Sequence, residues 1–167
     1  MIRLRPFKKQ DIDRILPWLT DERVLALWGA GKFSYPLTKE QLTARLETVE
    51  ETEKEWVMAA LDAQGTVVGH LYMWPDYEKN SLHLGMIVVD DARRGQGLGC
   101  QMLQKAVEYA FDILGMQKVT LGVFDCNFVA HACYMKAGFR DVGMESHALE
   151  FHGEVWNRIL MAIERNG

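Results

Sequence analysis

A glycine-rich turn between an apolar segment and an amphipathic segment constrains this chain more than any other feature. Residues 86–89 are apolar at every position, as in a central β-strand, and residues 98–114 repeat apolar side chains at spacings of three and four, as in a helix. The turn between them reads Arg94-Gly95-Gln96-Gly97-Leu98-Gly99. Glycines let a ligand approach the backbone closely, and free N–H groups at a helix start attract an anion. The turn therefore predicts a phosphate or pyrophosphate site; the alternative is an ordinary strand–helix connection.

Two common phosphate-binding motifs do not match this turn. A P-loop ends in Gly-Lys followed by Ser or Thr, whereas Gly99 is followed by Cys100 and Gln101. A dinucleotide-binding fingerprint has the spacing G-x-G-x-x-G, and here the third glycine comes one residue early. The sequence therefore disfavours both a P-loop and a nicotinamide-binding turn.

Apolar patterns predict the other elements. Alternating or continuous apolar residues predict strands at 2–6, 56–61, 66–73, 81–89, 118–123, 139–148 and 154–163. Helical periodicity and capping residues predict helices at 12–19, 38–49, 98–114 and 127–136. Because strands and helices interleave, we expect an α/β or α+β fold in which helices cover a mixed sheet.

Composition and charge exclude several classes of protein. The 167 residues suit a single domain, which we place at 1–167. Lys and Arg number 19 against 23 Asp and Glu, a net charge of −4 that disfavours nucleic acid as a partner. Cys100, Cys126 and Cys133 are odd in number and include no Cys-x-x-Cys pair, so we expect neither a disulfide framework nor a metal site. No signal peptide or membrane-spanning run is evident, and a cytoplasmic protein is expected.

A second segment carries a motif of its own. It reads Asn127-x-x-Ala130-x-x-x-Tyr134-x-Lys136-x-Gly138-Phe139. Together with Arg94-x-x-Gly97-x-Gly99, it resembles the GCN5-related N-acetyltransferases (GNAT), in outline over almost the whole chain and tightly over 84–139. Val129 departs from the Arg or Lys often found at its position. The resemblance implies a mixed, mostly antiparallel sheet of about six to seven strands flanked by helices.

The resemblance also implies acetyl-CoA as co-substrate. Backbone amides of the turn would hold the CoA pyrophosphate. The edge of the preceding strand would bind the pantetheine arm, in a slot made where that strand splays from 118–123. The acetyl-CoA-binding residues implied in this way are Ile87, Val88, Val89, Arg94, Gly95, Gln96, Gly97, Leu98, Gly99, Cys100, Asn127 and Ala130.

Acetyl transfer to an amine needs an acid for the leaving thiolate and a base for the ammonium group. Asn127, Ala130, His131 and Tyr134 lie at offsets of 0, 3, 4 and 7, which share one helix face. The resemblance implies that Tyr134 is the general acid. A half-buried aromatic residue that packs against the sheet is the alternative.

The base is open to several assignments. His83 lies on the strand before the turn, and its placement is similar to that of a histidine which some family members use for deprotonation. A strand histidine satisfied by hydrogen bonds is an equal alternative. Asp125 and Glu78 are rival candidates.

The expected function is transfer of an acetyl group from acetyl-CoA directly to a primary amine, either a small molecule or a protein N-terminus. A catalytically silent acyl-CoA sensor on the same fold is the alternative. The acidic run from Glu47 to Glu55 is either a solvated helix end or a rim for cationic amines. Edge strands near the C-terminus make a homodimer plausible, and the acceptor pocket is expected among aromatic residues of the N-terminal half. These are Trp18, Trp28, Phe33, Tyr35, Trp74 and Tyr77.

Overall fold

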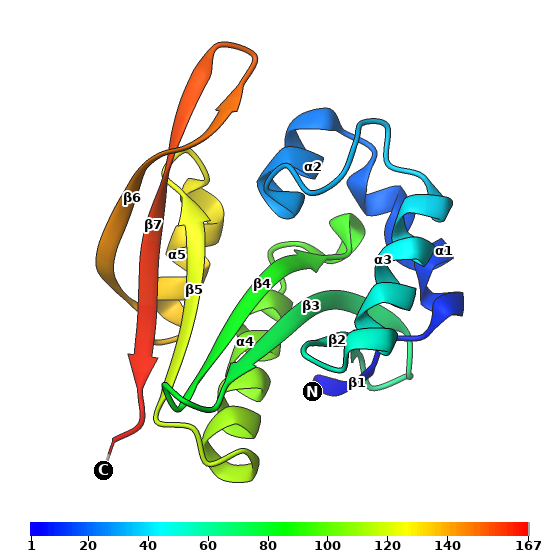
Figure 1. The fold of residues 1–167 in the computed structure, drawn as a ribbon. Helices are drawn as coiled ribbons and strands as arrows, with labels where there is room; N and C mark the ends of the chain where they lie inside the picture. The colour runs from blue at the N-terminus through cyan, green and yellow to red at the C-terminus, as the bar shows by residue number, and fades with distance from the viewer. Residues whose placement is uncertain (167) are drawn as a thin grey trace.

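A seven-stranded mixed sheet forms the centre of the computed structural model, which describes residues 1–166 (Figure 1). The strands are β1 (Arg3–Pro6), β2 (Trp56–Leu61), β3 (Val67–Asp76), β4 (Ser81–Val89), β5 (Lys118–Phe124), β6 (Arg140–Phe151) and β7 (Glu154–Glu164). Their order in the sheet is β1-β2-β3-β4-β5-β7-β6. The β4–β5 pair is parallel and the other five pairs are antiparallel. The predicted mixed, mostly antiparallel sheet is confirmed.

Helices cover both faces of the sheet (Figure 1). They are α1 (Ile12–Ile15), α2 (Glu22–Gly29), α3 (Lys39–Thr52), α4 (Leu98–Glu108) and α5 (Phe128–Lys136). The first three pack over a cluster that contains Trp18, Leu46 and Tyr72. The last two pack over a second cluster on the opposite face, which contains Leu103 and Tyr134. No helix within the described residues is long and apolar enough to cross a membrane.

Local sequence signals account for most of these elements. The Thr38 hydroxyl accepts a hydrogen bond from the Gln41 amide (3.2 Å) and caps α3. In the β2–β3 turn, the Asp62 carboxylate accepts bonds from two backbone amides, and Gly65 has a φ of +81°. These are the caps and turn residues that the sequence indicated.

Three helical segments differ from expectation. The helix predicted at 98–114 is α4 as far as Glu108, and a π-helical turn follows over Tyr109–Ile113. The segment predicted as one helix at 12–19 is α1 followed by a 3₁₀ turn at Leu16–Leu19, with Pro17 near the start of that turn. Helix α2 was not predicted at all. Asp21 caps it by accepting a bond from the Val24 amide (3.0 Å), and its buried Leu25 and Trp28 hold it against the sheet.

Candidate active site

The sheet opens between β4 and β5. Their pairing runs only from Ser81 opposite Lys118 to Leu84 opposite Leu121, whereas β4 stays paired with β3 as far as Val89. A register shift in the β3–β4 ladder and a φ of +47° at Met86 mark a bulge in β4, and bulges bend strands. Figure 1 shows β4 and β5 diverging from their paired ends. The end of β4 therefore has an edge that no neighbouring strand covers on the β5 side.

The glycine-rich turn follows directly on this free edge. Gly95 and Gly97 have φ values of +79° and +75°, and a Cβ built on either would meet no atom within 4 Å. Gly97 is the N-cap of α4 and offers no side-chain cap, so the first amides of the helix lack intrahelical acceptors. An anion can thus approach these amides without displacing protein atoms.

The two arginines before the turn have different partners. Arg93 contacts Asp62 (3.1 Å) and Gln96 (3.0 Å), and thereby fastens the turn to the β2–β3 hairpin. Arg94 is more exposed and pairs with Asp91 (2.6 Å) within one turn of chain. Of the two arginines, Arg94 is therefore the one closer to solvent, while Arg93 has a structural role.

Helix α5 meets the turn and the end of β4. A Cβ on Gly99 would lie 3.4 Å from Cys133 Sγ and 3.6 Å from Val89 Cγ2. Burial, and to a smaller extent Cys100, raises the pKa of the Cys133 thiol. This thiol stays protonated near neutral pH, so it is a packing group rather than a nucleophile.

The residues of the second motif divide between different tasks. Asn127 caps α5, its side-chain oxygen accepting a bond from the Ala130 amide (3.3 Å). His131 turns to β6 and contacts Asp141 (2.8 Å). Tyr134 is buried with the cluster under α4 and α5, and burial raises its pKa well above the usual value. Its phenol therefore keeps its proton at physiological pH.

His83 lies on the other face of the sheet from Tyr134. Its neighbours Leu82 and Leu84 join the cluster that holds Tyr134, and successive strand residues face opposite ways. The His83 ring contacts the Thr120 hydroxyl through Nδ1 (2.8 Å) and lies 5.7 Å from the Trp74 ring. The structure does not bring His83 and Tyr134 into contact, because they lie on opposite faces of the sheet.

The charge state of His83 follows from its neighbours. Partial desolvation of the ring lowers its pKa, and the positive charges of Lys32 and Arg158 lower it further. The imidazole is therefore neutral near pH 7. Of the rival bases, Asp125 uses both carboxylate oxygens to accept bonds from Asn157, from its amide (3.1 Å) and its side chain (3.0 Å). Glu78 lies in the exposed connection between β3 and β4.

The acidic run at the end of α3 is not uniform. Glu47, Glu50, Glu51 and Glu53 are exposed, as a solvated helix end requires. Glu55 instead is buried, pairs with Arg45 (2.7 Å) and accepts a hydrogen bond from the Trp74 indole. The expectation that Glu55 belongs to the solvated end is wrong. Helix α3 ends at Glu53, which has a left-handed backbone, and Glu55 then packs against Arg45 of α3 and Trp74 of β3.

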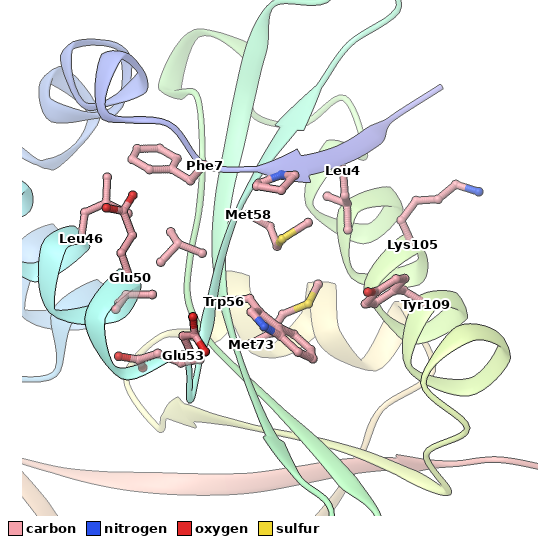
Figure 2. Close-up of a pocket in the computed structure, with 14 residues that line it drawn as sticks. Leu4, Phe7, Leu46, Glu50, Glu53, Trp56, Met58, Met73, Lys105 and Tyr109 are labelled. Atoms are coloured by element: carbon pink, nitrogen blue, oxygen red, sulfur yellow. The ribbon is translucent and has the colours of Figure 1, made fainter.

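A cavity of about 900 Å³ lies beside Glu50, Glu53 and Glu55 (Figure 2). Side chains of β1, β2, α3 and α4 line it, among them Trp56, Met58, Glu50 and Lys105, together with Tyr109 just after α4. None of the residues predicted for acetyl-CoA binding or catalysis is among its lining residues. The cavity is thus separate from the β4–β5 opening.

Comparison with known proteins agrees with this geometry. The model of the "Acetyltransferase (GNAT) family" matches residues 12–139. A Bacillus subtilis spermine/spermidine N(1)-acetyltransferase is 27% identical over 97 residues, 54% of this chain and 61% of that protein. The Homo sapiens N-acetylaspartate synthetase is 34% identical over 92 residues, 55% of this chain and 29% of that protein. The matched part thus spans less than two thirds of either relative.

Solved structures show the same fold. Spermidine N-acetyltransferase from Vibrio cholerae, in complex with CoA and spermine, has a TM-score of 0.85 at 20% identity and covers 98% of this chain and 95% of that one. A dodecameric structure of the Vibrio cholerae enzyme in an intermediate state has a TM-score of 0.76 at 21% identity and covers 98% of this chain and 93% of that one. Since the family model matches well over half of the sequence, the chain belongs to the GNAT acetyltransferase family.

Proposed function

We propose that this chain is an acetyl-CoA-dependent N-acetyltransferase that moves an acetyl group directly to a primary amine. One observation carries the proposal: the unpaired edge of β4 leads straight into a glycine-rich turn at an uncapped helix N-terminus. An extended arm that ends in a pyrophosphate matches both parts, since an arm adds along a strand edge and a phosphate binds helix amides. Membership of the GNAT family supports the same ligand.

The cofactor residues divide along this path. Ile87, Val88 and Val89 would contact the pantetheine arm, and Arg94 with the turn amides would hold the pyrophosphate. Asn127 and Ala130, at the start of α5, would contact the arm from the other side. The complete proposed set is Ile87, Val88, Val89, Arg94, Gly95, Gln96, Gly97, Leu98, Gly99, Cys100, Asn127 and Ala130.

Tyr134 would act as the general acid. The C–N bond to the amine forms, the C–S bond of the thioester breaks, and the departing CoA thiolate takes the phenol proton. Burial raises the pKa of Tyr134, so the hydroxyl is protonated before the step; the place of Tyr134 in the second motif, and not this shift, carries the assignment. No hydrogen bond within residues 1–166 contributes to the pKa of the Tyr134 hydroxyl, which burial and the Cys133 thiol raise.

His83 would accept the ammonium proton, directly or through a water molecule. Its lowered pKa supports this role because the ring is neutral at the working pH. Asp125 is the weaker candidate because Asn157 occupies its carboxylate.

Release of CoA thiol from acetyl-CoA over a panel of primary amines tests the function. We expect release above the amine-free rate with at least one amine, and its loss in Tyr134→Phe. Tight acetyl-CoA binding with no release on any amine would instead identify a silent acyl-CoA sensor.

The names of the relatives indicate acceptors of opposite charge, polyamines for one and aspartate for the other.

We also propose that 1–167 acts as a single domain and forms a homodimer, since the edge strand β6 exposes Val142 and Met144. Light scattering on the purified protein tests the dimer. A cytoplasmic location accords with three cysteines that form no disulfide, and cell fractionation tests it.

A further inference from the structure

The face of the β4–β5 opening that carries His83, here called the acceptor side, is bounded by an aromatic and a cationic side chain. Gly85 and Gly122 are the first residues beyond the last paired positions of β4 and β5. A Cβ on Gly85 would lie 2.6 Å from the Trp74 ring, and a Cβ on Gly122 would lie 2.6 Å from Arg158 Cδ. An indole therefore lies over one strand and an arginine over the other, at the point where the strands part.

Lys32 and His83 complete this surface. The Lys32 ammonium lies 4.9 Å from the centre of the Trp74 ring, in the connection between α2 and α3. His83 packs beside the same ring and contacts Thr120. Both Lys32 and Arg158 lower the pKa of His83 through their charge, so both cations face the proposed base.

The charges around this surface do not cancel. Arg45 is neutralised by Glu55 (2.7 Å), and Arg158 by Glu145 (2.7 Å). Lys32 has no carboxylate within ion-pair distance among the described residues. Desolvation and the charges of Arg45 and Arg158 lower the pKa of Lys32, and the charge of Glu55 offsets them only in part. The acceptor side therefore carries one net positive charge.

We propose that the acceptor is a small amine that bears a carboxylate, with Lys32 as the residue that selects it. This inference rests on the proposed N-acetyltransferase function. A carboxylate would neutralise Lys32 and gain charge-assisted hydrogen bonds, while the amine of the same molecule reaches His83. A polyamine would place a second ammonium group beside Lys32 and Arg158, where both nearby carboxylates are already paired.

The exposed glutamates do not offer a polyamine site at this opening. Glu50 and Glu53 line the cavity in Figure 2, whose lining includes neither Lys32, Trp74 nor His83. Glu50 and Glu53 thus line a cavity that is distinct from the surface formed by Lys32, Trp74 and His83. The uncompensated charge that an acceptor meets beside the β4–β5 opening is that of Lys32.

Matched acceptors test the proposal. β-Alanine and propylamine share a chain and differ in the carboxylate; aspartate, glutamate and spermidine complete the panel. We expect kcat/KM with at least one carboxylate-bearing amine to exceed that with propylamine and with spermidine by about tenfold or more, the scale of one charge-assisted contact. Lys32→Glu should reverse this preference and Lys32→Arg should keep it. Lys54→Glu, the same charge change at an exposed residue, should leave it unchanged.

The outcomes separate the two proposals. The acceptor inference is overturned if turnover is fastest with spermidine and Lys32→Glu does not alter that preference. The proposed N-acetyltransferase activity would then still stand. No turnover with any amine, despite acetyl-CoA binding, overturns the transferase. Calorimetric titration of N-acetylglutamate into the CoA-bound protein then decides the anion site: binding that Lys32→Glu abolishes supports it, and absence of binding overturns it.

Discussion

Replacing Gly97 by alanine tests the phosphate-binding turn with a built-in control. Gly97 has a φ of +75° and Gly115 a φ of +70°, and at both positions an added Cβ meets nothing within 4 Å. The two substitutions therefore impose the same left-handed strain and no clash. We expect each to lower the free energy of unfolding by about 1 kcal/mol, and the melting temperature by about 2–4 °C.

The two variants should differ in cofactor binding. A methyl group added at Gly97 would lie in open space at the start of α4, where the pyrophosphate is proposed to lie, whereas Gly115 lies beyond the π-helical turn that follows α4. A hydrogen bond from an amide to a charged phosphate contributes about 1.5–3 kcal/mol. Losing one such bond should raise the Kd for acetyl-CoA by about tenfold to about 150-fold in Gly97→Ala.

Isothermal titration of acetyl-CoA and thermal unfolding, on both variants and the unmodified chain, measure the two quantities. We expect equal losses of stability and a loss of affinity in Gly97→Ala alone. Equal affinity in the two variants would refute the assignment of the turn to the pyrophosphate.

Three further predictions concern single side chains. Tyr134→Phe should lower kcat by about 100-fold, the usual scale of general acid catalysis, with the Kd of acetyl-CoA unchanged; steady-state kinetics with an unaltered kcat would exclude the role. The acidic limb of the kcat/KM profile should lie below the ordinary histidine pKa, because His83 acts when neutral and its pKa is lowered. His83→Ala should remove this limb, and a pH profile that keeps it would exclude His83 as the base. Burial opposes ionisation of Asp11, but Arg5 at 2.6 Å and the Lys8 amide leave its pKa lowered. Its contribution is therefore present above the unfolded-state pKa and lost as pH falls through the folded-state pKa. Asp11→Asn should cost about 2–3 kcal/mol at pH 7 and much less in acid, as measured by urea unfolding at both pH values; a pH-independent difference would argue against the ion pair.

Local patterns in the sequence accounted for the elements that local interactions hold. The Thr38 cap, the Asp62–Gly65 hairpin and the periodic stripe of α4 all lie where the sequence predicts. The glycine-rich turn has positive φ at Gly95 and Gly97, as a turn of that composition requires. Helix α2 was missed although Asp21 was a readable cap, because its eight residues are held by packing of Leu25 and Trp28 rather than by their own propensity.

The acceptor side depends on contacts between residues far apart in the chain. Thr120 reaches His83 because β4 and β5 are parallel in that register, and Arg158 covers Gly122 because β7 pairs with β5. Neither register follows from the pattern of a single strand. Glycines inside two apolar strands, Gly85 and Gly122, were the one sequence signal of a close approach at this place.

The most direct test of the account is a crystal structure of this chain with CoA bound. We expect the pyrophosphate within hydrogen-bond distance of the amides at 95–99, and the pantetheine arm between β4 and β5, with its sulfur near Tyr134. CoA bound in the cavity of Figure 2, or anywhere that leaves the β4–β5 opening empty, would contradict it.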